Sequence, residues 1–500
     1  MTLARKALTI SSWTLLSRIL GLVRDRLWAG AMGGSVVLDA FLVAFAAPNM
    51  LRELFGEGAL SQAFIPRYVQ LRERDPAAAE VLAGAVMTRL LAVLSAVAVV
   101  GMAVAVAVVL SAAPGSKGFY VAALALPMVP YAIFICAAAL LAGVLQSRNV
   151  FWVPAAAPVI LNVAMISTIW LSPEAEAWIL PQVVLVAGVL QALFPLAWLI
   201  RMRAQPPLTT AWPLEASELV RAVAPVLLAS GVHQFNAFVG QVIALALVPG
   251  AGAVQFLYFA QRLLMFPAAL IGHGVTTAVY PELSRRSGLG YASMGDGLRE
   301  ATRLQAFWLL PAAVGMAVVA EPLVRSIYQV GNFDAHAIAR TVLCTQMFAL
   351  ALVPLSLTKL LVRAFHASRD QRTPMRVSLV MVAANLVLTL ALVMTPLQEA
   401  GLALATAGSQ TLGCVIYALT LRRRGAGQVV ELARLGRPLL GALILAAGCS
   451  ILLWYWPQPP GRGSLYAVLR LTAAVTLGMG LYLAVAGTGF LRRRRTSANA

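Results

Sequence analysis

The chain has 500 residues, of which 60% are hydrophobic and only 11% are charged, and its net charge is +19. A soluble protein needs about 25% charged residues to cover its surface, so this composition excludes a string of soluble domains. Nucleic-acid binding is excluded as well, because the basic residues lie in short gaps between apolar stretches and no polar domain carries a basic face. We therefore expect an all-α polytopic membrane protein.

Fourteen apolar stretches are long enough, at about 20 residues each, to cross a membrane as helices. They cover approximately residues 7–30, 36–62, 82–111, 119–145, 152–171, 177–200, 220–248, 252–280, 303–320, 341–364, 376–396, 400–421, 436–456 and 465–490. Both ends of the chain and the even-numbered gaps contain most of the Lys and Arg, whereas the odd-numbered gaps contain Lys117, Arg325, Arg340 and Arg462. The positive-inside rule therefore predicts that both termini are cytoplasmic.

The first two predicted spans carry charged residues, which are costly in lipid and usually face a cavity or a partner. Helical spacing places them on two stripes, Ser17, Gly21, Arg24, Asp25 and Trp28 on the first span, and Asn49, Arg52, Glu53, Gly56 and Glu57 on the second. Pro48 cannot donate a hydrogen bond to the carbonyl of Ala44, so we expect a bend there.

These stripes fit either of two roles. In the first role, the stripes line a wet cavity with surplus positive charge, where guanidinium groups bind phosphate oxygens through paired donors. Alternatively, pairs such as Arg18 with Asp25, or Arg52 with Glu53, only neutralise each other and hold helices together. Asp39 has a similar alternative, since an acid near the start of a helix interacts favourably with its dipole.

Charges elsewhere in the spans are few. Arg262 in the eighth span has no obvious acidic partner and supports the cavity interpretation. Arg221, Lys359 and Arg470 lie near span ends, where we expect their side chains to reach the membrane surface.

An internal repeat divides the chain. Gly56-Glu57-Gly58 resembles Gly272-His273-Gly274 at an offset of 216 residues, and Ser147-Arg148-Asn149 resembles Ser368-Arg369-Asp370 at an offset of 221. Six helices separate the copies, so both halves have the same orientation in the membrane. We expect a lobe of six helices at 1–205, a second at 206–425, and two appended helices with a basic tail at 426–500, with alternating access around a central cationic cavity.

Enzyme chemistry has no sequence signature here. No nucleophile elbow, phosphate-binding loop or dinucleotide fingerprint occurs, and no aqueous loop is large enough for a transferase site. The four cysteines lie far apart and the four histidines are scattered. We expect neither a metal site nor a cofactor.

Three stretches carry a resemblance to a known family. Residues 17–68, which begin SRILGLVRDRLWAG, together with residues 258–285 and 357–377, resemble the MurJ (MviN) family of lipid II flippases. That family belongs to the multidrug, oligosaccharidyl-lipid and polysaccharide exporters. The resemblance implies fourteen helices in the bacterial inner membrane. It also implies transport of undecaprenyl-diphosphate-linked disaccharide-pentapeptide to the outer leaflet for peptidoglycan assembly, with membrane lipids and cell-wall synthesis proteins as partners.

The resemblance also implies a substrate-binding site. Its residues are Arg18, Arg24, Asp25, Asp39, Arg52, Glu57 and Arg262. Some members bind sodium through an acid on the seventh helix and polar residues on the eleventh and twelfth. This chain has Gly240 or Gln241 at the first position and Thr389 where the last acid would stand, although Asn385 is retained. We therefore expect coupling to the membrane potential and no sodium site.

Three alternatives remain open. The nearest is a flippase for another polyprenyl-diphosphate-linked oligosaccharide, which only a substrate assay separates. A cation-coupled drug antiporter of the same fold usually has twelve spans and an acidic cavity. The third is a membrane scaffold that transports nothing, against which the intact set of arginines argues.

Overall fold

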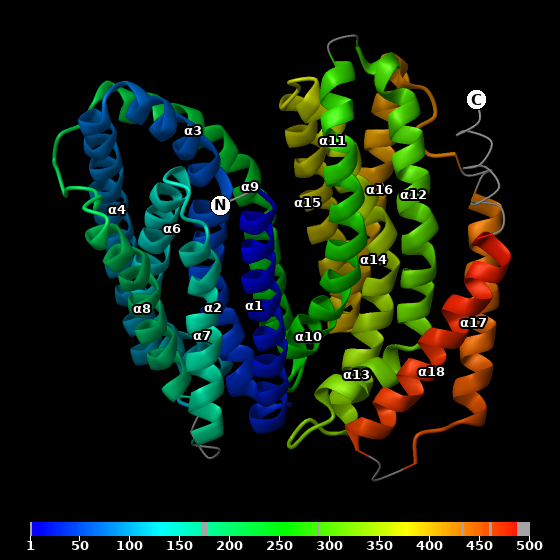
Figure 1. Ribbon diagram of the computed structural model, residues 1–500. Coiled ribbons are helices and arrows are strands. Elements are labelled where there is room, and N and C mark those ends of the chain that lie inside the picture. Colours follow the sequence, from blue (N-terminus) through cyan, green and yellow to red (C-terminus); the bar gives the residue numbers. More distant parts are fainter. Residues whose placement is uncertain (1–2, 172–177, 288–289, 432–434, 460–462, 488–500) are drawn as a thin grey trace. The chain divides into compact units, whose positions relative to one another are not determined.

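The computed structural model of the chain describes residues 3–171, 178–287, 290–431, 435–459 and 463–487 (Figure 1). Every regular element within these ranges is a helix, which confirms the predicted all-α fold. The contacts divide the chain into two units, an N-terminal unit of Met1–Ala246 with Gly250–Gly252 and a C-terminal unit of Leu247–Pro249 with Ala253–Ala500. These units are defined by contacts, whereas the lobe boundary expected near residue 205 is defined by the sequence repeat and stays a prediction.

The N-terminal unit contains the helices drawn from blue to green in Figure 1. They are α1 Leu3–Met32, α2 Val36–Arg52, η1 Glu53–Gly58, α3 Ala59–Arg74, α4 Pro76–Ser111, α5 Lys117–Met128, α6 Tyr131–Ser147, α7 Trp152–Leu171, α8 Ile179–Arg201 and α9 Leu214–Leu247. Helix α1 packs on α7, α2 packs on α5, and α6 packs on α8. A shared core of side chains from α3, α4, α6, α8 and α9 joins the ends of these helices.

The C-terminal unit contains the remaining helices. They are α10 Ala253–Pro267, η2 Ala268–His273, α11 Gly274–Ser287, α12 Tyr291–Val318, α13 Ala320–Tyr328, α14 Ala335–Ala367, α15 Arg372–Val393, α16 Glu399–Leu421, η3 Arg422–Ala426, α17 Gly436–Tyr455, α18 Ser464–Tyr482 and η5 Leu483–Gly487. Helix α14 packs against α10, α12 and α16, and α17 packs against α12 and α18.

Each of the fourteen predicted spans lies on one helix or on consecutive helices. By length and composition, ten described helices are apolar enough to cross a membrane, and the bent pair α5–α6 makes eleven. The three other predicted spans begin on α1, α2 and α9. In α9, the part Gly231–Leu247 counts as a shorter apolar helix. In α1, the charges that mark the candidate site also lower the hydropathy. The chain is thus a multi-pass membrane protein, and the count of fourteen remains a prediction.

The predicted repeat has a structural counterpart at the glycine motifs. In both halves a π-helical turn interrupts a helix pair, as η1 between α2 and α3 and as η2 between α10 and α11. Helix α2 continues through Pro48, so the change of helical geometry comes five residues later than the expected bend. In η2 a side chain at position 272 would crowd α14, because a Cβ on Gly272 would lie 2.8 Å from the Ser356 Oγ.

At the second motif, the structure corrects the alignment of the repeat by one residue. Asn149 and Arg369 both adopt the left-handed conformation after a helix, with φ of 62° and 57°. Their N–H groups bond the carbonyls of Gln146 and His366, respectively. This C-terminal cap fixes the register, because the left-handed residue must directly follow the last turn. Asn149 and Arg369 are therefore equivalent, and Arg148 is not the counterpart of Arg369.

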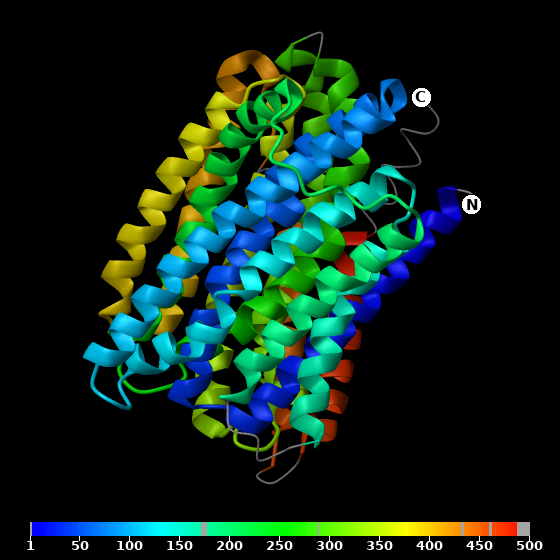
Figure 2. The same ribbon diagram turned by 90° about the vertical axis from the view of Figure 1, so that its left-hand side faces the viewer.

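The segment 202–213, which joins α8 to α9, packs along α4. Figure 2 shows it as a green coil crossing the blue helix. The N–H of Thr209 bonds the Thr88 hydroxyl at 3.2 Å. At Gly84 a Cβ would lie 1.8 Å from the Pro207 carbonyl oxygen, so only glycine allows this approach. The contact fixes the start of α9 against α4.

Arginine side chains join the predicted cytoplasmic helix ends in both units. In the N-terminal unit Arg148 pairs with Glu80, and in the C-terminal unit Arg424 pairs with Asp370 at 2.6 Å. Burial alone would raise the pKa of Asp370, but hydrogen bonds from Thr373 and Arg424 lower it to about 2. Asp370 is therefore ionised at every physiological pH, and its pair with Arg424 persists.

Candidate functional site

The stripe predicted on α1 forms a buried polar cluster against α7. Arg24 is 4% exposed. Its Nε and Nη2 donate to Asp25 Oδ1 at 3.1 and 2.8 Å, and its Nη1 donates to Asn162 Oδ1 at 3.1 Å. The guanidinium also lies 4.5 Å from the Trp28 ring centroid. Asn162 in turn donates to the Ser17 carbonyl at 3.1 Å. Arg24 is thus neutralised and fixed in orientation within the N-terminal unit.

The stripe on α2 is more open. The side chain of Arg52 is 28% exposed and lies 3.8 Å from Glu53, and its Nε donates to Asn49 Oδ1 at 3.1 Å. Glu53 also accepts hydrogen bonds from Asn49 and from Gln234 of α9. Glu53 is therefore held by polar groups from two helices, while the Arg52 side chain stays partly exposed.

Two other predicted residues of the N-terminal unit differ from this pattern. Arg18 lies on α1 beside the buried stripe, and its side chain is exposed. The expected alternative pairing of Arg18 with Asp25 is wrong, because Arg24 occupies Asp25. The side chain of Glu57 lies outside the described part of the structure.

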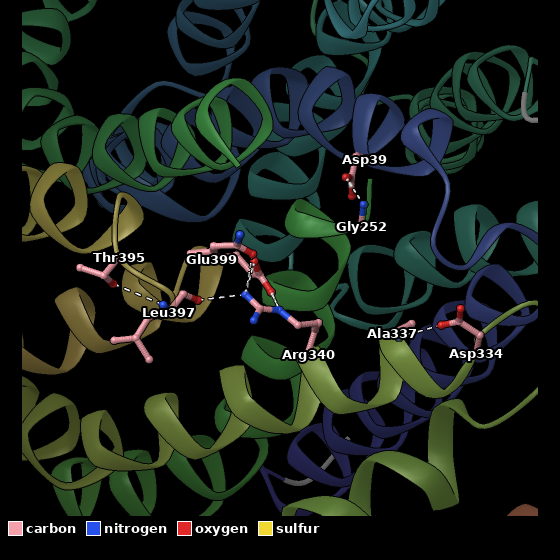
Figure 3. Close-up of polar contacts among 9 residues, drawn as sticks. Asp39, Gly252, Asp334, Ala337, Arg340, Thr395, Leu397 and Glu399 are labelled. Atoms are coloured by element: carbon pink, nitrogen blue, oxygen red, sulfur yellow. Dashed lines mark hydrogen bonds and ion pairs between the residues drawn. The ribbon is translucent and has the colours of Figure 1, made fainter. Parts of the chain in front are cut away.

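Asp39 lies in the first turn of α2 and is buried. Its Oδ2 accepts the N–H of Gly252 at 2.7 Å, as Figure 3 shows. Close to the same connection, the Lys117 ammonium donates to the Leu245 carbonyl at the end of α9, at 2.8 Å. Asp39 therefore lies at the start of a helix, as expected, and it also binds the backbone of the segment that follows α9.

Arg262 lies on α10 in the C-terminal unit and its side chain is exposed. Its Nη2 donates to the Tyr258 hydroxyl at 2.7 Å, and its guanidinium stacks 5.0 Å from the Tyr258 ring centroid. The Tyr258 side chain thus orients Arg262 through both a hydrogen bond and a cation–π contact.

Several polar residues of the spans were missed from the sequence. Asn162 and Gln234 supply the partners of the α1 and α2 stripes. The signal for Asn162 was available, since it is a polar amide in the otherwise apolar α7.

The positions considered for sodium hold neutral groups. The Asn385 amide lies 3.4 Å from the Ser409 hydroxyl, and Thr389 is buried. Among the described residues, no three His, Cys, Asp or Glu side chains come together as metal ligands would.

Two buried arginine clusters of the C-terminal unit were also missed. Arg340 of α14 binds both carboxylate oxygens of Glu399, at 2.5 and 2.8 Å (Figure 3).

Arg470 of α18 is only 2% exposed, so the expectation that it reaches the membrane surface is wrong. It lies 3.6 Å from Glu321 of α13 and donates to Gln458 at 3.3 Å. The Glu321 side chain is itself 43% exposed, so Arg470 is the buried member of this pair.

Comparison with known proteins identifies the family of the chain. A family profile described as "Lipid II flippase MurJ" matches residues 28–462. The chain belongs to the MurJ family of lipid II flippases. A Burkholderia cenocepacia "Lipid II flippase MurJ" is 34% identical, covering 99% of this chain and 100% of the relative. A Rhizobium tropici "Probable lipid II flippase MurJ" is 31% identical, covering 97% of this chain and 93% of the relative. The predicted family resemblance is thereby confirmed.

Solved structures agree at the level of the fold. A "Lipid II flippase MurJ, inward closed conformation" superposes with a TM-score of 0.81 at 22% identity, covering 97% of this chain and 99% of that one. An "Inward-facing conformation of a multidrug resistance MATE family transporter of the MOP superfamily" has a TM-score of 0.67 at 15% identity, covering 84% and 98%. The MurJ and MATE folds are thus related, as the sequence predicts.

Proposed function

We propose that this chain moves lipid II, the undecaprenyl-diphosphate-linked peptidoglycan precursor, from the cytoplasmic to the periplasmic leaflet of the bacterial inner membrane. The observation that carries the proposal is membership of the MurJ family over nearly the whole chain. The cationic residues on α1, α2 and α10 suit the diphosphate of such a lipid.

The arginines have different tasks in this proposal. The side chain of Arg52 is 28% exposed and Arg262 is an exposed residue, and in this proposal both bind the diphosphate directly. Arg24 is neutralised by Asp25 and held by Asn162 in this state, and it binds the substrate in another conformational state of the alternating-access cycle. Arg18, Asp25, Asp39 and Glu57 complete the polar surroundings.

Complementation tests the proposed function. Expression of this chain should restore growth to a strain depleted of its essential lipid II flippase. Purified protein in proteoliposomes should make labelled lipid II accessible on the opposite leaflet. If it moves another polyprenyl-diphosphate-linked oligosaccharide but not lipid II, the substrate assignment is wrong, and if it moves neither, the scaffold alternative is favoured.

Membrane topology provides an independent prediction. We expect cytoplasmic termini and a periplasmic connection between α4 and α5. A cysteine replacing exposed Pro114 should react with an impermeant reagent in intact cells, whereas one replacing exposed Gln205 should react only after permeabilisation. Pro114 is preferred to Gly115, whose φ of 82° strains any side chain. The reverse labelling pattern would contradict the orientation.

Energy coupling provides a second prediction. We propose that flipping responds to the membrane potential, because a unit charge crossing 100 mV changes in energy by about 2.3 kcal/mol, enough to shift two nearly balanced states. Activity in proteoliposomes should follow a potential set with potassium and valinomycin. A dependence on sodium at fixed potential would contradict this and direct attention to the neutral oxygens near Asn385.

A further inference from the structure

A cavity of about 550 Å³ lies in the C-terminal unit, where the turn after α13, the start of α14 and the α17–α18 connection meet. Its volume falls within the range of about 300–1,000 Å³ that small-ligand sites occupy. The residues that matter for its chemistry are Arg325, Gln329, Phe333, Asp334, Ile338 and Gln458. This end of the unit belongs to the gaps predicted to be periplasmic, where the chain has few basic residues.

Arg325 presents unused donors at this cavity. Its Nε donates to Glu321 Oε1 at 2.9 Å, one turn earlier on α13. Its two terminal amino groups donate no hydrogen bond to any described residue. A guanidinium fixed through Nε and open at both Nη atoms has the paired geometry that binds a carboxylate.

Contacts of the buried Arg470 hold the cationic side of the cavity in place. Arg470, 2% exposed, lies 3.6 Å from Glu321 and donates to Gln458. Arg470 thus fixes Glu321, which orients Arg325, and also fixes Gln458, which lines the cavity itself. Glu321 faces two guanidinium groups, so this side of the cavity keeps surplus positive charge.

The other side of the cavity carries a carboxylate. Asp334 caps α14, and its Oδ1 accepts the N–H of Ala337 at 2.7 Å (Figure 3). Its Oδ2 accepts no hydrogen bond within the described parts of the chain. The cap holds the side chain in position, and the second oxygen remains available for an ammonium group.

We propose that this cavity binds a short peptide that carries both a free carboxylate and a free ammonium group. The carboxylate binds Arg325, the ammonium binds Asp334, and Gln329 and Gln458 line the same cavity. Phe333 and Ile338, both buried, supply apolar contact for small side chains. A simple anion would meet repulsion from Asp334, and a simple cation would meet repulsion from Arg325.

Two sources supply such a ligand. One is a free peptide outside the membrane. The other, which rests on the proposed function, is the pentapeptide of lipid II as it reaches the periplasmic side. The recognised chemistry is the same, so the first experiment uses a free peptide and does not depend on flipping.

Chemical blocking of the ligand tests the proposal directly. Binding of trialanine to the full-length protein in detergent is measured by saturation-transfer NMR, at peptide concentrations up to about 10 mM. N-acetylation and C-terminal amidation should each weaken binding about tenfold, because each removes a charge-assisted hydrogen bond. Equal binding of all three peptides, no binding at all, or equally strong binding of inorganic phosphate would overturn the proposal.

Two substitutions assign the contacts. Arg325→Gln should remove the sensitivity to amidation and keep the sensitivity to acetylation, whereas Asp334→Asn should do the opposite. Asparagine caps helices as well as aspartate does, so Asp334→Asn preserves the start of α14. The control is Arg376→Gln, an exposed arginine of α15 that does not line the cavity. If Arg325→Gln does not fold, the blocked peptides still test the wild-type protein.

The source of the ligand is decided last. If lipid II displaces trialanine from the wild-type protein but not from Asp334→Asn, the cavity receives the lipid-linked pentapeptide. If lipid II does not compete, this deeper assignment fails and the free-peptide site remains. Failure of complementation with intact trialanine binding would overturn the proposed flippase function alone, so the two failures are distinguishable.

Discussion

Replacing Arg262 or Arg52 by alanine should abolish complementation of a flippase-depleted strain while leaving the amount of inserted protein unchanged. Neither side chain is deeply buried, so we expect its removal to cost less stability than removal of a buried arginine. Each charged hydrogen bond to the diphosphate contributes about 1.5–3 kcal/mol, and a bidentate arginine makes two. Lysine should restore growth only partly, because it keeps the charge but loses the paired donors.

Arg24→Ala should fail for an additional reason. Its removal leaves the Asp25 carboxylate buried without its counter-charge, which costs about 3–5 kcal/mol. We therefore expect a low protein level in membranes, measured by immunoblot. The double variant Arg24→Ala with Asp25→Ala should recover the protein level but not growth. Arg376→Ala is the control for loss of one exposed arginine, and normal growth of Arg262→Ala would contradict the diphosphate site.

The sequence predicts the local part of this site well. Helical periodicity correctly groups Ser17, Arg24, Asp25 and Trp28 on one face of α1, because that face is set by 3.6 residues per turn. It does not predict what covers the face. The partner, Asn162, is 138 residues away on α7, and only the packing of two helices decides whether a charged stripe meets water or an amide.

For Arg470, too, the sequence does not predict which residues cover the side chain. Its place near a span end favours exposure at the membrane surface, which is the usual result for a long basic side chain. The short helix α13 lies in what the sequence presents only as a gap, and it brings Glu321 to Arg470. A single acid on an unrecognised helix is enough to reverse the expected exposure.

Arg340 and Glu399 form a bidentate ion pair in the C-terminal unit. Two nitrogens of Arg340 bind the two oxygens of Glu399, and Nη2 also donates to the Leu397 carbonyl at 3.0 Å. The Glu399 side chain is 2% exposed, against 19% for Arg340. The pair joins α14 to the first residue of α16, so it fixes the start of two long helices that pack on each other.

Arg340→Ala should therefore destabilise the purified protein by about 3–5 kcal/mol, because it leaves a buried carboxylate without a partner. Glu399→Gln should cost less, since the amide oxygen still accepts from Arg340 and no unpaired charge is buried. The double variant Arg340→Leu with Glu399→Leu should come close to the wild type, as apolar replacement of a buried pair is often neutral. Thermal unfolding in detergent measures all three. A double variant as unstable as Arg340→Ala would show that the packing at this helix end, and not the uncompensated charge, determines the loss.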